Sequence, residues 1–425
     1  MDVNLTVVSY AVAAVVLYYI VLFVVSLIHL ERVPSVPAGA APFIVVMIPA
    51  RNEEEVIGPT VRSVLALPYD QFAVLVVNDG STDRTGAIAR SISDPRLAVI
   101  DRDPASAGKG KSAVLNHGFR VVEALTHEGQ LLHAWGADRV VVGILDADGR
   151  LQTNTLETVA GYFADPGIAS VQIGVQIGNA RDNMLSRLQD MEFVAFTYFV
   201  QVARQWLGSS GLGGNGQFNR LSALRTLGPA PWAPASLTED LDIGLRLIRA
   251  GWRTAFCDRC FVFQQGLTRW KPLMRQRTRW IQGHYQCWKH IPGLLVSPAR
   301  LRTRIDLVAY LMMVVTVVVV SFELLCTLLA LVGVVTVTNG FLGFLTPLGR
   351  RYAQVVFALA PISAFLFTYQ RHSAARLRWW ELPAFGAVFT AYSYVWIVAT
   401  LRAWTRVAIG RWTWVKTPHA GAAVG

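Results

Sequence analysis

The sequence predicts an α/β domain with a mostly parallel sheet, held at a membrane by apolar helices on both sides of it. Between residues 43 and 145, apolar runs rich in β-branched residues alternate with segments of helical spacing. One long apolar stretch precedes this region, and three further stretches follow near the C-terminus. In addition, 53% of the residues are hydrophobic and only 16% are charged, whereas about a quarter are charged in ordinary globular chains.

The first apolar stretch, Val7–Leu30, carries no charged residue. It is long enough to cross about 30 Å of hydrocarbon. No basic region precedes it and no A-x-A-like site follows it, so we expect a retained anchor rather than a signal peptide. Residues 1–40 therefore form a transmembrane anchor with a linker, whose Pro- and Ala-rich part is Pro34–Pro42.

The basic residues predict which side of the membrane the domain occupies. Thr268–Arg304 contains nine Lys or Arg and no Asp or Glu, which places this segment in the cytoplasm against anionic headgroups. We expect an interfacial amphipathic region at 268–304, transmembrane helices at 305–403 and a cytosolic tail at 404–425. Three single spans would not put both Thr268–Arg304 and the basic tail inside, so the number of C-terminal spans stays open.

An excess of 39 Lys and Arg over 28 Asp and Glu gives a net charge of +11, which indicates an anionic partner. Because the basic residues cluster beside apolar stretches, we expect that partner to be the lipid bilayer rather than nucleic acid. Glu323 lies inside an apolar run, where a carboxylate is costly and often functional. The alternative is that Glu323 lies at a bend near the interface.

The α/β domain is expected at 41–267. Strands are predicted at 43–49, 73–77, 97–100 and 140–145, with helices at 53–67 and 85–93 between them. Ligands of such sheets bind beyond the carboxyl ends of the strands. Polar clusters follow three of these strand ends: Arg51-Asn52-Glu53, Asp79-Gly80 and Asp146-Ala147-Asp148.

Each cluster allows a chemical and a structural interpretation. Asp146 and Asp148 offer hard oxygen ligands for Mg²⁺ or Mn²⁺, or they are solvated turn residues. Asp79 binds a nucleotide base or ribose, or it caps the following helix. The acidic segment Thr238–Asp242 lies before a helical run, where acids also favour the helix dipole.

Three other functional motifs are excluded. The sequence Gly108–Ser112 (GKGKS) lacks the spacing of a phosphate-binding P-loop. Cys257 and Cys260 have no further pair or nearby histidine, and zinc would need four ligands, so we expect ordinary thiols. The first strand is followed by Pro49-Ala50-Arg51-Asn52 rather than G-x-G-x-x-G, which argues against a dinucleotide-binding oxidoreductase.

The motifs together, and their order, resemble the motif set of family 2 glycosyltransferases. The motifs are Asp79-Gly80-Ser81, Gly110-Lys111 with Leu115-Asn116, Asp146-Ala147-Asp148, Gly213-Gly214-Asn215-Gly216, Thr238-Glu239-Asp240 and Gln276-Arg277-Thr278-Arg279-Trp280. The resemblance covers about residues 41–290 and extends to the flanking spans. It is strongest to the membrane-embedded, processive kind, which includes cellulose, chitin, hyaluronan and poly-N-acetylglucosamine synthases.

This resemblance implies a GT-A fold that uses a nucleotide-diphosphate sugar, most often a UDP-sugar, together with Mg²⁺ or Mn²⁺. It implies that Asp240 is the general base, with the other catalytic residues being Glu239, Gln276, Arg279 and Trp280. The implied nucleotide-binding residues are Pro49, Glu53, Asp79, Lys111 and Asp146. The implied metal ligands are Asp146 and Asp148, with Asp148 favoured as the direct one, and the implied acceptor-binding residues are Trp280, Gly214 and Asn215.

The expected reaction is an inverting transfer of a sugar to a growing β-linked polysaccharide. The alternative is a single transfer to a membrane lipid, either diacylglycerol or a polyprenyl phosphate. We expect a multi-pass protein of the plasma membrane whose catalytic domain is cytoplasmic. Because the chain has few apolar segments to line a translocation path, a second copy or an accessory subunit would complete one.

Overall fold

The computed structural model describes residues 2–4, 6–28, 41–338 and 347–412. The linker expected at 34–42 lies outside these residues up to position 40, and so does the tail from position 413. A small parallel pair of strands, β1 (Asp2–Asn4) and β10 (Thr336–Thr338), joins the start of the chain to the segment that follows the helix α13 (Met313–Leu331).

The main sheet has eight strands in the order β4-β3-β2-β5-β8-β7-β9-β6. β4, β3, β2 and β5 are parallel, as are β7 and β9, whereas β8 and β6 run antiparallel to their neighbours. The strands are β2 (Phe43–Ala50), β3 (Phe72–Asn78), β4 (Leu97–Asp101), β5 (Val140–Ile144), β6 (Arg150–Leu151), β7 (Ile168–Ile177), β8 (Gln217–Arg220) and β9 (Arg253–Gln264).

The four strands predicted from the sequence are β2, β3, β4 and β5, and the α/β class with a mostly parallel sheet is confirmed. Residues of β2 are buried almost throughout, as expected of a strand covered on both faces. Helices cover both faces of the sheet, with α2 (Ile57–Leu65), α3 (Thr85–Arg90) and α5 (Thr155–Tyr162) on one, and α4 (Lys111–Ala124), α8 (Leu221–Arg225) and α9 (Glu239–Arg249) on the other. The side chains of β2 alternate between these two cores: Ile44, Val46 and Ile48 face one, and Phe43, Val45 and Met47 face the other.

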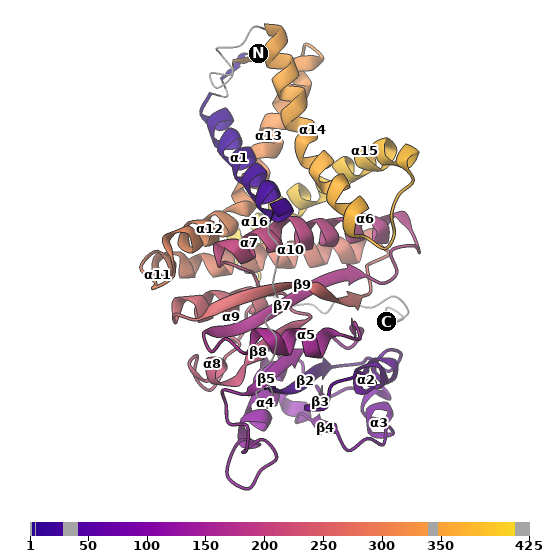
Figure 1. Ribbon diagram of the computed structural model, residues 1–425. Coiled ribbons are helices and arrows are strands. Elements are labelled where there is room, and N and C mark those ends of the chain that lie inside the picture. The colour runs from indigo at the N-terminus through magenta and orange to yellow at the C-terminus, as the bar shows by residue number, and fades with distance from the viewer. Residues whose placement is uncertain (1, 5, 29–40, 339–346, 413–425) are drawn as a thin grey trace.

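A further helical layer lies between the sheet and the apolar helices (Figure 1). One continuous helical segment passes from α6 (Met184–Ala195) through a π-helical turn (Phe196–Gln201) into α7 (Val202–Leu207). The other members of this layer are α10 (Trp270–Cys287), the short helix α11 (Ile291–Leu295), α12 (Leu301–Leu311) and α16 (Val395–Ala408). Single 3₁₀ turns lie at Pro104–Ser106, Trp288–His290 and Trp379–Glu381.

Three helices project from this layer away from the sheet, namely α1 (Thr6–Ile28), α13 (Met313–Leu331) and α14 (Pro347–His372) (Figure 1). Among the described residues, Thr6–Ile28 and Trp379–Ala408 are long and apolar enough to cross a membrane, and the second of these includes α15 (Leu382–Ser393) and α16. A third candidate arises if α12 and α13, bent by 59° at their junction, form one span. Within the region 305–403 expected to hold transmembrane helices, the apolar stretch at 353–369 belongs to α14, which contains Pro361 and is not among these candidates.

Glu323 lies within α13 rather than at a bend, and its Oε1 accepts a hydrogen bond from Ser9 Oγ of α1 at 2.9 Å. This polar contact joins two of the projecting helices. The carboxylate therefore has a partner in an apolar setting, where an unpaired polar group would be costly.

Candidate active site

The carboxyl ends of β2, β3 and β5 meet at one edge of the sheet, because these strands are parallel neighbours. There the chain opens onto a cavity of about 1570 Å³. All thirteen residues that the sequence analysis proposed for the site line this one cavity: Pro49, Glu53, Asp79, Lys111, Asp146, Asp148, Gly214, Asn215, Glu239, Asp240, Gln276, Arg279 and Trp280. The motifs, which span more than 200 residues of chain, are thus brought together in space.

Asp79 is fixed at the end of β3 by several hydrogen bonds. Its carboxylate is buried, forms an ion pair with the equally buried Arg102, and accepts a hydrogen bond from the backbone N–H of Gly108 at 3.1 Å. Its own N–H donates to the carbonyl of Ala50 at 2.8 Å, which ties β3 to β2. The side chain is therefore held rigidly at the cavity wall, and Arg102 is a neighbour that the sequence did not indicate.

Lys111 is the first residue of α4 and reaches across the cavity. Its Nζ pairs with the carboxylate of Asp146 and donates to the carbonyl of Gly214 at 2.6 Å. Burial on its own would lower the pKa of Lys111, but the carboxylates of Asp146, Glu239 and Asp240 raise it above its usual value. This residue is therefore a fixed positive charge in the middle of an acidic site.

Gly214 and Asn215 hold the strand ends in register. A Cβ atom at Gly214 would lie only 3.3 Å from both Asp240 Oδ2 and Lys111 Nζ, so a larger residue would crowd the charged groups. The Asn215 Oδ1 accepts from the N–H of Asp146 at 3.1 Å, and its Nδ2 donates to Gln264 Oε1 at 3.2 Å. Asn215 thus links the end of β5 to the end of β9 and helps to position the segment Asp146-Ala147-Asp148.

Glu239 and Asp240 form an acidic pair in the first turn of α9, where Glu239 is buried and Asp240 is half-buried. Burial, together with the neighbouring charge of Asp240, raises the pKa of Glu239 to about 7. Burial also raises the pKa of Asp240, whereas the N–H of Leu241, which donates to Oδ1 at 2.8 Å, and the positive charges of Lys111 and Arg279 act in the opposite direction. The pKa of Glu239 therefore lies close to neutrality, and the raised pKa of Asp240 suits a group that must accept a proton.

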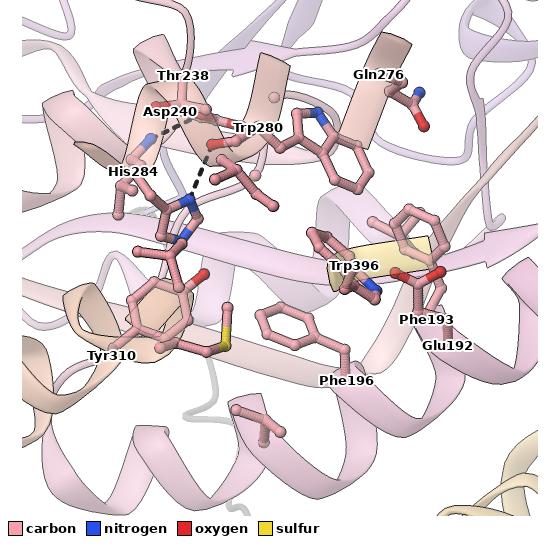
Figure 2. A pocket seen from close by; sticks show the side chains of 18 of the residues that line it. Glu192, Phe193, Phe196, Thr238, Asp240, Gln276, Trp280, His284, Tyr310 and Trp396 are labelled. Carbon is pink, nitrogen blue, oxygen red and sulfur yellow. Dashed lines mark hydrogen bonds between the residues drawn. The ribbon is translucent and has the colours of Figure 1, made fainter. Parts of the chain in front are cut away.

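α10 lies against the start of α9, and this contact positions its polar residues. A Cβ atom at Gly283 would lie 2.3 Å from the Thr238 side chain, so the two helices approach as closely as glycine permits. The Nη1 of Arg279 donates to the carbonyl of Leu237 at 2.9 Å, which fixes the guanidinium beside the acidic pair. Gln276 lies one turn earlier on α10, at the opposite end of the view from Asp240 (Figure 2).

Trp280 belongs to an aromatic wall made by three helices (Figure 2). Its ring is stacked on Trp396 of α16, with centroids 6.2 Å apart, and contacts Phe193 of α6 edge-on at the same distance. The guanidinium of Arg277 lies 4.2 Å from the Trp280 ring centroid, on top of the indole face. Two of the residues that orient Trp280, Phe193 and Trp396, are therefore more than 80 positions away from it in the sequence.

Arg277 is fully buried and forms hydrogen bonds with residues around this wall. Its Nη2 donates to Glu192 Oε2 at 2.8 Å, and the same oxygen accepts from the hydroxyl of Tyr392 at 2.5 Å. Its Nη1 donates to Gln276 Oε1 at 2.6 Å. Glu192 and Tyr392 could not be identified from the sequence, because no local motif marks the partner of a buried charge.

His284 also lines the cavity and was missed by the sequence analysis, although it lies one helical turn after Trp280. Its Nδ1 is 3.1 Å from the carbonyl of Trp280, which can only accept, so Nδ1 carries the proton. Burial lowers the pKa of His284 to about 4, and the ring is neutral at physiological pH. In Figure 2 the imidazole lies between Asp240 and Tyr310, whose ring centroid is 5.3 Å away.

The cavity continues beyond the aromatic wall into the space between the projecting helices. There its lining is mostly apolar: Val15, Tyr19 and Phe23 of α1, Met313, Val317 and Val320 of α13, and Ala360, Ala364 and Phe365 of α14. The same cavity thus has a charged end at the sheet and an apolar end between the projecting helices α1, α13 and α14. This continuity could not be inferred from the separate motifs.

The charged end offers two carboxylates for a divalent cation. Asp146 and Asp148 both line the cavity, and Asp148 Oδ2 also accepts from the N–H of Gln265 at 3.3 Å. Within the described ranges no cluster of three or more His, Cys, Asp or Glu side chains could hold a metal ion. Two carboxylates nevertheless fit Mg²⁺ or Mn²⁺, which keep waters and take further oxygen ligands from substrate phosphates. The pairing of Asp146 with the ammonium group of Lys111 indicates that the position beside Asp146 attracts a cation.

The chain matches a known family over most of the α/β domain and α10. The model of the family described as Glycosyltransferase like family 2 matches residues 41–283. A beta-monoglucosyldiacylglycerol synthase of Synechocystis sp. is 32% identical over 296 residues, which cover 67% of this chain and 57% of that protein. A poly-beta-1,6-N-acetyl-D-glucosamine synthase of Staphylococcus aureus is 22% identical over 259 residues, which cover 60% of this chain and 58% of that protein.

The chain spans little more than half the length of the curated relatives it matches. Among solved structures, a mannosyltransferase of Pyrobaculum calidifontis in complex with GDP-Man and Mn²⁺ aligns with a TM-score of 0.61 at 18% identity. The alignment covers 94% of this chain and 98% of that one. The GT-A fold expected from the resemblance is thereby confirmed.

Proposed function

The chain belongs to the Glycosyltransferase like family 2, and on that premise we propose that it transfers a single sugar from a nucleotide-diphosphate sugar to a hydroxyl of a membrane lipid. One observation carries this proposal. The cavity that contains Asp240 continues into a mostly apolar space between α1, α13 and α14. An acyl chain in that space would place its polar head at the acidic pair.

The comparisons support this choice of acceptor. The relative that is 32% identical to this chain is named for the synthesis of a glycolipid, beta-monoglucosyldiacylglycerol. A diacylglycerol-like molecule, with one free hydroxyl and two acyl chains, has the same division into polar and apolar parts as the cavity. The polysaccharide product expected from the sequence is the second candidate, favoured by the 22% identity to a poly-N-acetylglucosamine synthase. A sugar chain would, however, find few hydrogen-bonding groups between these helices.

The residues of the charged end fit an inverting transfer. In this proposal the acceptor hydroxyl oxygen forms a bond to the anomeric carbon from the face opposite the diphosphate. The bond between that carbon and the diphosphate oxygen breaks, and its electron pair stays with the diphosphate. Asp240 takes the hydroxyl proton, and burial, which raises its pKa, makes it a stronger base than an exposed aspartate.

The leaving group needs positive charge beside it. Lys111 lies at the acidic end of the cavity, and Arg279 is fixed next to the same pair by its hydrogen bond to Leu237. A divalent cation bound by Asp146 and Asp148 would add charge neutralisation at the diphosphate. Asp79, fixed by Arg102, is suited to contact the nucleoside, and Trp280 offers a flat face to a sugar ring.

The proposal can be tested at the apolar end of the cavity without touching the charged end. Val317 lines the cavity, whereas the adjacent Val318 on the same helix does not. We expect Val317→Trp to fill the acceptor space and lower sugar transfer to lipid about tenfold or more, which is the order of a misplaced substrate. Donor binding, measured by equilibrium dialysis of a labelled nucleotide sugar, should be unchanged.

Val318→Trp is the matched control, since it adds the same indole to the same helix on a different side. It should retain nearly full transfer. Equal transfer by both variants would show that the acceptor does not use the space beside α13.

A further inference from the structure

A second cavity of about 470 Å³ lies between the start of α6 and the segment that joins α14 to α15. It shares no lining residue with the active-site cavity. Four arginines line it: Arg181, Arg187, Arg376 and Arg378. We refer to it as the arginine pocket.

Among the residues that line the arginine pocket, four arginines face a single carboxylate. The carboxylate in its lining is Glu381, which pairs with Arg378 Nη2 at 2.8 Å and also accepts from the N–H of that residue. The Nε of Arg187 is buried and has no hydrogen-bond partner among the described residues. Four guanidinium groups around one space, one of them with a buried Nε that has no partner among the described residues, suit a phosphate group, which accepts several charge-assisted hydrogen bonds from arginine.

The surroundings of the pocket place it at the level of lipid headgroups. Trp379 and Trp380 directly follow Arg378 and are 77% and 53% exposed. Met184, at the start of α6, lines the pocket and is 51% exposed. Exposed tryptophans next to arginines are typical of the membrane–water interface. In Figure 1 the lower end of α14 meets α6 beside α15, at the level where the projecting helices leave the helical layer.

We propose that the arginine pocket binds the phosphate of an anionic membrane lipid, with the acyl chains lying along Trp379, Trp380 and Met184. This site is separate from the donor and acceptor sites, so the proposal goes beyond the transferase function and does not depend on it. A soluble phosphate has the same charge but lacks the acyl chains, and it would gain nothing from the exposed tryptophans. The apolar side chains at the rim therefore favour a lipid.

The test measures lipid binding to the full chain in detergent by native mass spectrometry. Phosphatidylglycerol is titrated against phosphatidylcholine with the same acyl chains. We expect discrete binding of phosphatidylglycerol and much weaker binding of phosphatidylcholine. The double variant Arg181→Gln/Arg376→Gln should weaken phosphatidylglycerol binding roughly 30-fold, from about fivefold for each arginine at a membrane surface. Both side chains are exposed, so the core stays intact.

The matched control is Arg371→Gln/Arg402→Gln, which removes the same charge from exposed positions outside the pocket. It should leave the affinity within about twofold of the wild type. An equal loss in both double variants would overturn the proposal, because it would show general electrostatic attraction. Displacement of phosphatidylglycerol by millimolar inorganic phosphate would also overturn it, because the pocket would then be a site for free phosphate. Sugar transfer is not measured, so failure here leaves the proposed function unaffected.

Discussion

The substitution Asp240→Asn separates the chemistry at the acidic pair from the binding of the donor. Asparagine keeps the oxygen that accepts from the N–H of Leu241 at 2.8 Å, so the first turn of α9 should be preserved. An amide cannot take up the proton of the acceptor hydroxyl, so the substitution removes this function. We therefore expect the nucleotide sugar to bind as before while transfer is lost.

The size of the loss follows from what remains in the site. A positioned general base contributes about 10²–10⁴-fold to a rate, or about 3–5 kcal/mol in the barrier. Glu239 is the nearest other carboxylate, and part of the rise of its pKa to about 7 comes from the charge of Asp240. Without that charge its pKa falls, so any dependence of the rate on the ionisation of Glu239 should shift to lower pH than in the wild type.

The assay is single-turnover transfer in lipid nanodiscs at saturating donor, with donor affinity measured separately and rates recorded from pH 5 to 9. Asp182→Asn, an exposed position outside the cavity, is the control and should behave as the wild type. Turnover within about threefold of the wild type in Asp240→Asn would refute the base assignment. An unchanged pH profile would refute the coupling between Asp240 and Glu239.

Two further outcomes test the buried charge and the cation site. Arg277→Met should destabilise the protein by about 3 kcal/mol, because it leaves the half-buried Glu192 without its cation. Adding Glu192→Gln should recover part of that loss. The unfolding temperature should therefore fall in Arg277→Met and rise again in the double variant. Asp148→Ala should raise the Mg²⁺ or Mn²⁺ concentration needed for half-maximal donor binding at least about tenfold. An unchanged metal requirement would remove Asp148 from the cation site.

The sequence was most informative where structure is encoded locally. β2 and β3 are uninterrupted apolar runs that end in polar clusters, so both the strands and the edge at which the site lies could be predicted. β7 and β9 were not predicted. β7 includes Gln172 and Gln176 among its buried residues, and β9 contains an irregularity next to Gly174 of its partner strand. Strands that bury polar residues or contain a bulge lack the periodicity on which such predictions depend.

The aromatic wall shows why part of the site was missed. Trp280 could be identified from its motif, but its stacking partner Trp396 is on α16, and Glu192, which pairs with Arg277, is on α6. Those contacts arise only when α6 and α16, which are far from α10 in the sequence, pack on α10. The composition of α10, rich in arginine and tryptophan, predicts a helix at the membrane surface and gives no sign that Arg277 is fully buried.

The central claim is that the acceptor is a membrane lipid reached through the apolar end of the cavity. The most direct measurement incubates the purified protein in vesicles with Mg²⁺ or Mn²⁺, diacylglycerol and a panel of labelled nucleotide sugars, and then separates products by solvent extraction and size. We expect label from one donor in a small molecule that extracts into organic solvent and contains one sugar. Label in a high-mass, water-soluble polymer would contradict the claim and favour the polysaccharide alternative.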